Sequence, residues 1–406
     1  MKTKINENEK KQFEYFIGVI SSAVSAAEAP LPYDGINWDS MLNIAKLCGL
    51  ESMFADSILK LKDRISLPDE LCTRLKMINS QQILIDSVLD YEIAKVIDAF
   101  EKHKVKNAPV KGYFLKNEYP RTDFRSVSDF DILFDESQLE QVRAAFSELS
   151  YEFIQNDDSQ YHFKKAPYMY IEMHNSLVHK DDDYYKYLSN QLDRAIKREG
   201  YEYSYQLSLE DHYLYLLIHS SNHFRSGGMS IRMLLDIWLY NKHHRDEFNF
   251  QYLKEKLNLY KLEKFEEQIM HITNNWFSNP TPLISFDELE TYIILICRLG
   301  RLDAAIIISS QKSIDRKDGA KGSKLSFLLH DVFPPRSSYQ YRYPKAYKYP
   351  ILIPFAWCHK WLSRFFIEKN VNIKRGFKNR LSYNEEDVLH LKSVFKKVGF
   401  DDLNFS

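Results

Sequence analysis

The spacing of apolar residues changes twice along this chain, and these changes restrict its fold more than any other feature. Through the first hundred residues, apolar side chains recur every three or four positions, as amphipathic helices require. The pattern then changes to short segments rich in aromatic and β-branched residues, and helical spacing returns from about residue 208. We therefore expect three parts: an N-terminal helical segment over 1–100, an α/β core over 101–200 and a C-terminal helical domain over 201–406.

Composition favours a globular protein in which helices dominate. The chain has 406 residues, of which 44% are apolar, and it contains only 12 Gly and 13 Pro. This apolar content can build a large core, whereas so few Gly and Pro provide too few turns for an all-β sandwich or barrel. Lys and Arg number 55 against 56 Asp and Glu, which gives a net charge of −1. Such a balance excludes a histone-like or generally polybasic nucleic-acid binder.

The cysteines and the N-terminal sequence indicate a cytoplasmic protein. Cys48, Cys72, Cys297 and Cys358 lie far apart and form no CxxC pair, so we expect reduced thiols rather than a disulfide framework or a zinc ribbon. The N-terminal residues lack the apolar region of a signal peptide, and no stretch approaches the roughly 18 apolar residues of a membrane span. We expect a soluble, cytoplasmic chain without a transmembrane segment, and the oligomeric state stays open.

Local patterns place strands and helices within these parts. Strands are expected over 105–110, 129–134, 151–155, 160–164 and 168–174. Helices are expected over 113–119, 137–149, 212–222, 231–242, 251–276, 286–298 and 385–397. Ser208, with Asp211 three residues later, is typical of a helix N-terminal cap, and Gly227-Gly228 separates that helix from the next.

Two aspartates on one expected strand are the first candidates for chemistry. Asp129 and Asp131 are two residues apart, so both side chains leave the same face of the strand, roughly 7 Å apart along it. Two like charges at a partly desolvated strand cost on the order of a few kcal/mol unless a cation or an arginine compensates them. The pair therefore indicates a site for Mg²⁺ ions that also bind phosphates.

A third carboxylate and a glycine turn extend this candidate site. Glu172 shares one face of its expected strand with His174, and it meets the aspartates if that strand lies beside theirs. Lys111-Gly112 ends a strand and begins a helix. A residue without a side chain at such a turn lets a phosphate approach the backbone N–H groups.

Together these motifs resemble the uncharacterised nucleotidyltransferase family of the polymerase-β superfamily. The resemblance rests on Lys111-Gly112, Tyr119-Pro120, Arg125, the segment 128–133 and the segment 171–174, and it continues weakly in Glu210-Asp211, His219, His223, Arg232 and Leu235-Asp236. It implies an α+β fold with a polymerase-β-like nucleotidyltransferase core on a mixed sheet, flanked by N-terminal and C-terminal helical segments. It also implies two divalent metals and transfer of a nucleoside monophosphate (NMP) from a nucleoside triphosphate (NTP).

The resemblance further implies roles for individual residues. By the resemblance, Asp129, Asp131 and Glu172 become metal-binding and catalytic residues. We also expect Lys111, Gly112, Arg125 and Ser128 to bind the nucleotide, and His174, His219 and His223 are the candidates for an acceptor pocket. The cofactor is expected to be Mg²⁺ or Mn²⁺, the NTP is expected to be ATP, and the acceptor is a hydroxyl or phosphate on a small molecule, protein or RNA. One departure stands out, because many members of the wider superfamily carry Gly-Gly or Gly-Ser after the first strand, where this chain has Lys111-Gly112-Tyr113.

Several of these residues also have simpler interpretations. Arg125 could contact phosphate or pair with one of the acids. His219 and His223 are four residues apart on a helix and could bind a metal together, but no Glu lies between them as in HExxH, so a structural or pocket role is favoured. Arg232 and Asp236 have the spacing of an ion pair within one helix.

A basic segment near the C-terminus leaves the function open in another way. Residues 336–380 hold eleven Lys or Arg and a single acid, Glu368, with tyrosines between the charges. Such a segment could bind single-stranded nucleic acid, or it could cover the acidic remainder of the chain. Three functions remain after this reasoning: a nucleotidyltransferase, a non-catalytic nucleotide-binding or partner-binding module on the same fold, and an RNA-directed transferase.

Overall fold

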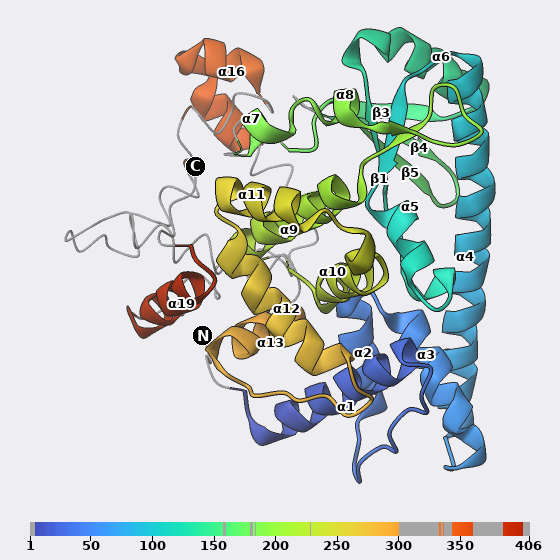
Figure 1. Ribbon diagram of the computed structural model, residues 1–406, viewed down its shortest axis with the longest axis vertical. Helices are drawn as coiled ribbons and strands as arrows, with labels where there is room; N and C mark the ends of the chain where they lie inside the picture. The colour runs from blue at the N-terminus through green and yellow to red at the C-terminus, as the bar shows by residue number, and fades with distance from the viewer. Residues whose placement is uncertain are drawn as a thin grey trace.

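One mixed sheet and a bundle of helices make up the protein. The computed structural model describes residues 5–156, 160–178, 182, 184–227, 229–299, 333, 336, 343–359 and 385–400. The sheet lies beside α4 (Asp69–Lys102), a helix that runs along one whole side of the molecule (Figure 1). The predicted α+β class and the mixed sheet are confirmed.

The sheet has five strands in the order β1-β2-β5-β4-β3. Their bounds are β1 (Asn107–Val110), β2 (Phe130–Phe134), β3 (Glu152–Asn156), β4 (Gln160–Lys165) and β5 (Met169–His174). All five predicted strands are present, with ends within two residues of the expected ones. β2 and β5 pair in parallel, and the other neighbours pair antiparallel. The two strands that carry the acids, β2 and β5, are therefore neighbours in the sheet.

Capping residues fix the ends of the N-terminal helices. These helices are α1 (Glu7–Val24), α2 (Trp38–Cys48), α3 (Glu51–Leu59) and the long α4. Asn6 and Glu9 form a reciprocal capping box at the start of α1. Gly49 ends α2 at φ 68°, a left-handed conformation that glycine adopts without steric cost.

The C-terminal half follows the predicted helices with one correction. Its main helices are α9 (Leu209–Ser226), α10 (Ile231–His244), α11 (Phe250–Tyr260), α12 (Glu263–Phe277), α13 (Glu288–Leu299) and α19 (Glu385–Lys397). Ser208 caps α9 through the backbone N–H of Asp211, as expected. The single helix predicted over 251–276 is wrong, because Lys261 adopts φ 55° and the Leu262 N–H bonds back to the Leu257 carbonyl. This Schellman-type end turns Leu262 into the core.

Short elements connect these parts. They are η1 (Lys60–Asp63), α5 (Gly112–Leu115), η2 (Lys116–Glu118), η3 (Thr122–Phe124), η4 (Glu136–Gln138), α6 (Leu139–Glu148), α7 (Tyr185–Leu188), α8 (Gln191–Arg194), β6 (Ile196–Lys197), β7 (Tyr205–Gln206), η5 (Arg245–Glu247), α16 (Pro344–Lys348) and η7 (Pro350–Leu352). Of the basic segment 336–380, only residue 336 and residues 343–359 belong to the described part, so its predicted roles lie largely outside the described residues.

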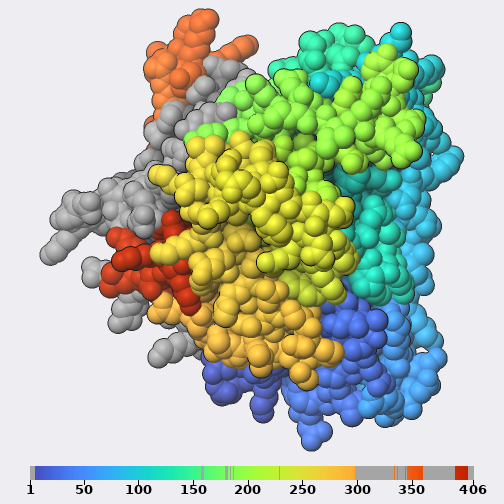
Figure 2. Space-filling model, viewed as in Figure 1, coloured from blue at the N-terminus to red at the C-terminus, as the bar shows by residue number. Residues whose placement is uncertain are grey.

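Two apolar cores hold the elements together. One lies between the sheet, α4 and α6, where Phe146 stacks on Phe163 with ring centroids 4.2 Å apart. The other joins α1–α3 to α9–α13, with Phe16 and Trp276 fully buried in it. The C-terminal helices accordingly lie directly against the N-terminal ones (Figure 2). The first and last predicted parts thus share a core, and the division at residues 100 and 200 stays a prediction.

No helix within the described ranges is both long and apolar enough to cross a membrane.

A buried histidine in the larger core predicts a pH effect on stability. His212 of α9 packs on Tyr240, with ring centroids 4.9 Å apart, and burial lowers the pKa of His212 to about 4. In the unfolded chain the pKa of histidine is about 6.5. The unfolded state therefore takes up a proton first as the pH falls. The neutral ring contributes its full stability above pH 6.5 and loses about 3 kcal/mol as the pH falls to 4.

We expect His212→Phe to remove this loss, because phenylalanine keeps a ring in the same space without a titratable nitrogen. Urea unfolding at pH 7 and pH 4.5 measures it: the free energy of unfolding should fall less between the two values in the variant than in the wild type. An equal fall in both proteins would contradict the assignment.

Candidate functional site

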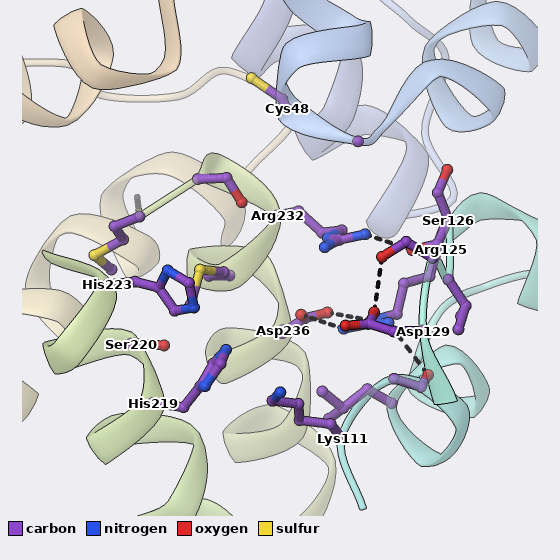
Figure 3. A pocket seen from close by; sticks show the side chains of 18 of the residues that line it. Cys48, Lys111, Arg125, Ser126, Asp129, His219, Ser220, His223, Arg232 and Asp236 are labelled. Carbon is purple, nitrogen blue, oxygen red and sulfur yellow. Dashed lines mark hydrogen bonds and ion pairs between the residues drawn. The ribbon is translucent and has the colours of Figure 1, made fainter. Parts of the chain in front are cut away.

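A cavity of about 520 Å³ opens where the sheet meets the helices. Its walls come from segments far apart in the sequence: the end of α2, the turn after β1, the loop before β2, the middle of α9, the start of α10 and the end of α13. Figure 3 shows the loop that carries Asp129 facing α9, with His219 and His223 on the opposite wall. The N-terminal and C-terminal helices and the sheet therefore enclose one shared site.

The acids on β2 and β5 meet at this cavity. Asp131 lies opposite Glu172 in the parallel register of the two strands, so both side chains share a face of the sheet. His174 follows two residues later on the same face. Ligand atoms of Asp131, Glu172 and His174 all lie within 4.8 Å of one another. Of the three carboxylates expected to converge, the structure brings Asp131 and Glu172 together, and it adds the imidazole of His174.

Asp129 occupies a different position from Asp131. It directly precedes β2, is half-buried, lines the cavity and accepts a hydrogen bond of 2.7 Å from the Ser128 hydroxyl. It is not one of the three residues of the compact cluster. The role of Asp129 as a metal ligand therefore stays a proposal.

His174 lies beside the two carboxylates. Its side chain is buried, and it is not among the residues that line the cavity. Its Nε2 lies 2.9 Å from Asp131 Oδ1 and 3.6 Å from Glu172 Oε2. The strand alternation that turns Glu172 toward Asp131 turns His174 there as well, and the place of His174 in an acceptor pocket stays a prediction.

Lys111 places a positive charge next to the carboxylates of the cluster. Its Nζ lies 3.1 Å from Asp131 Oδ1, the same oxygen that His174 contacts. Although burial opposes ionisation, Lys111 and then His174 hold the pKa of Asp131 well below its usual range. Burial raises the pKa of Glu172, and the charge of Asp131 raises it further. Asp131 Oδ2 accepts no hydrogen bond from any described residue, so this oxygen can serve a cation.

The backbone at Lys111 is strained. Its φ of 53° and ψ of −123° belong to a region that residues with a side chain rarely adopt. The next residue, Gly112, opens α5 and lies against Arg125, Val127 and the Asp129 carbonyl. A lysine thus stands where the geometry favours glycine, and its ion pair with Asp131 provides a compensating contact.

Gly112 leaves little room for a side chain in this arrangement. A Cβ there would lie 3.1 Å from Arg125 Nη1 and 3.4 Å from Val127 Cγ1. We expect Gly112→Ala to lower the free energy of unfolding by about 1–3 kcal/mol, because Arg125 is held by hydrogen bonds to Asp236 and cannot move away from the added methyl group without losing them. Urea unfolding checks this, with Ser128→Ala as a control at an exposed position of the loop before β2. A change below about 0.5 kcal/mol, within the range of neutral surface substitutions, would show that the turn can adjust.

Arg125 pairs with an acid that was not expected. Its Nε and Nη2 donate to the two carboxylate oxygens of Asp236 at 2.7 and 2.8 Å, and its Nη1 donates to the Gly112 carbonyl at 3.2 Å. Asp236 also accepts from the Tyr119 hydroxyl at 2.7 Å. Pairing of Arg125 with one of the strand acids is therefore wrong. The predicted pair of Arg232 with Asp236 is wrong too, since Arg125 offers a bidentate fork that a helix neighbour cannot match.

The remaining predicted residues take separate places. Ser128 is exposed and lines the cavity beside Asp129. His219 and His223 line the far wall, with ring centroids 4.4 Å apart. In the described part of the chain, no third metal-binding side chain joins these two histidines. Their position suits contact with a bound molecule.

Fold and site together define an α+β protein whose mixed sheet presents paired carboxylates and a lysine-glycine turn to a cavity closed by helices. The chain belongs to the uncharacterised nucleotidyltransferase family, whose model matches residues 34–278, more than half of the chain. The resemblance of the motifs is thereby confirmed, and membership supports a transferase activity in general. Curated proteins give no match, and neither do solved structures.

Proposed function

We propose that this protein transfers an NMP from an NTP, with AMP from ATP as the expected case, to a hydroxyl or phosphate acceptor with the help of Mg²⁺ or Mn²⁺. One observation carries the proposal: the parallel register of β2 and β5 places Asp131 and Glu172 side by side at the wall of a cavity. Family membership supports nucleotidyl transfer, and a polymerase-β-like core is the fold we propose for residues 101–200.

The donor set fits a divalent cation. Carboxylate oxygens are the ligands that Mg²⁺ and Mn²⁺ prefer, and Asp131 and Glu172 supply them next to Asp129. Asp131 stays ionised because Lys111 holds its pKa low, so it is ready to bind. A bound cation would neutralise the charge of the triphosphate during transfer.

Lys111 and Gly112 are the residues that we propose for the phosphates. Lys111 Nζ lies 3.1 Å from Asp131 in the described state. A cation on Asp131 would repel this ammonium and leave it to contact a phosphate oxygen instead. Gly112 begins α5 and lines the cavity, so its backbone N–H is the group that we propose for a phosphate contact. Arg125 holds this turn from behind through the Gly112 carbonyl, so it is a positioning residue.

The acceptor would enter from the side of α9. His219, Ser220 and His223 line the wall across the cavity from Asp129. Glu172 lines the same cavity, and we propose that it also helps to take up the proton that the acceptor hydroxyl loses. The protein then contributes position and charge, and no covalent intermediate is required.

The test is incubation of the protein with each labelled NTP, Mg²⁺ or Mn²⁺, and a cell lysate, followed by separation of protein, RNA and small molecules. We expect label from one NTP to appear in one of these fractions only when a divalent cation is present. Metal-dependent NTP binding without label transfer would favour the non-catalytic module, which the Lys111-Gly112-Tyr113 departure also favours. Label in RNA would support the RNA-directed alternative.

A further inference from the structure

Arg232 is the second arginine at the cavity, and its surroundings differ from those of Arg125. It lies in the first turn of α10 and reaches toward the loop that carries Ser126 and Asp129 (Figure 3). Its Nη1 donates to the Ser126 carbonyl. Its Nε is buried and has no hydrogen-bond partner. Among the described residues, no carboxylate lies within 4.0 Å of this guanidinium, the distance of an ion pair.

The acid nearest in sequence is already used. Asp236 is one helical turn from Arg232, but both of its oxygens accept from Arg125, and Tyr119 donates to it as well. Burial lowers the pKa of Arg232, and the positive charge of Arg125 lowers it further. Arginine still stays protonated at neutral pH, and Asp236 and Asp129 act on the charge of Arg232 without direct contact among the described residues.

A partly buried charge of this kind is unfavourable unless an anion meets it. The start of α10 provides a second feature that favours an anion. α10 has 14 residues, its N-cap Ser230 makes no side-chain capping bond, and both Ser230 and Arg232 line the cavity. The positive end of a helix and a guanidinium whose Nε has no partner therefore meet at one wall.

We propose that Arg232 binds the polyphosphate of the nucleotide, the role that sequence reasoning gave to Arg125. This inference rests on the proposed function, because it assigns the anion in the cavity to the NTP substrate. Lys111 contacts Asp131 and Arg125 contacts Asp236, whereas the Nε of Arg232 has no partner among the described residues. Its planar fork matches two oxygens of a phosphate group.

Calorimetric titration with pyrophosphate in the presence of Mg²⁺ tests the inference without any acceptor. We expect the Kd of Arg232→Gln to rise by about tenfold or more, since a charge-assisted contact is lost. Arg232→Lys should give an intermediate Kd, because it keeps the charge and loses the fork. Arg74→Gln is the matched control: Arg74 is exposed on α4, pairs with Asp39 and should leave the Kd unchanged.

Thermal unfolding shows whether each variant is folded. If Arg232→Gln does not fold, the comparison of Arg232→Lys with the wild type still tests the inference. Equal pyrophosphate affinity in the wild type and Arg232→Lys and Arg232→Gln would overturn the inference, as would a wild type that does not bind pyrophosphate. The transfer assay separates this result from the proposed function. If the variants keep both transfer and wild-type pyrophosphate affinity, the role of Arg232 is refuted and the proposed function is not. If the variants bind pyrophosphate more weakly but the wild type shows no transfer, the proposed function is refuted and the role of Arg232 is not.

Discussion

Asp131→Asn is expected to reduce nucleotidyl transfer by about a thousandfold or more, which corresponds to roughly 4 kcal/mol of lost transition-state stabilisation. Asparagine has nearly the same shape but lacks the negative charge that a divalent cation requires. The contact with Lys111 at 3.1 Å would also weaken, and Lys111 can turn toward the cavity that it lines. We therefore expect the fold to persist, as far-UV circular dichroism can check.

The measurement is transfer of label from the NTP that the wild type uses, with wild type and variant at equal concentration. Asp135→Asn is the matched control, because Asp135 directly follows β2 and is exposed, and asparagine can replace it as a helix cap. This control should keep wild-type activity. Activity retained in a folded Asp131→Asn protein would remove the basis of the proposed mechanism.

Asp236→Asn is expected to lower the free energy of unfolding by about 3–5 kcal/mol, the usual cost of removing one partner of a buried ion pair. The side chains of Arg125 and Asp236 are only 7% and 6% exposed, so the guanidinium would stay buried without its counter-charge. The Tyr119 hydroxyl would lose its charged acceptor at the same time. Urea unfolding at neutral pH measures this effect.

A double variant separates the ion pair from general damage to the core. Arg125→Met combined with Asp236→Leu removes both charges and keeps apolar volume, so it should be more stable than Asp236→Asn alone. If the double variant loses as much free energy of unfolding as Arg125→Met and Asp236→Leu lose together when made singly, the pair is not coupled. Because Arg125 also holds the Gly112 carbonyl, the double variant should still lose activity.

The predicted elements agree well with the structure where they depend on local pattern. Alternation over 129–134 and 168–174 predicted β2 and β5, and Ser208 predicted the start of α9. The break at Lys261 was missed because no glycine or proline marks it. The residue adopts a left-handed conformation so that Leu262 can enter the core.

The candidate site was predictable only in part. The alternation fixes which face Glu172 takes, so its meeting with Asp131 needed only that the two strands be neighbours. The same alternation held the signal for His174, which now joins the cluster. Nothing in the sequence showed which arginine meets an acid, since Arg125 and Asp236 are 111 positions apart.

The amino-acid sequence by itself determined the order of helices and strands, the face of each strand that carries acids, and the membership of a nucleotidyltransferase family. These depend on side-chain periodicity and on caps within a few residues, which act before distant segments meet. Only the tertiary structure decided which charges are neutralised: Asp131 is paired with Lys111 and His174, and Arg125 is paired with Asp236. Partner choice among charged groups depends on distance and burial in the folded chain, and spacing along the sequence carries no information about either.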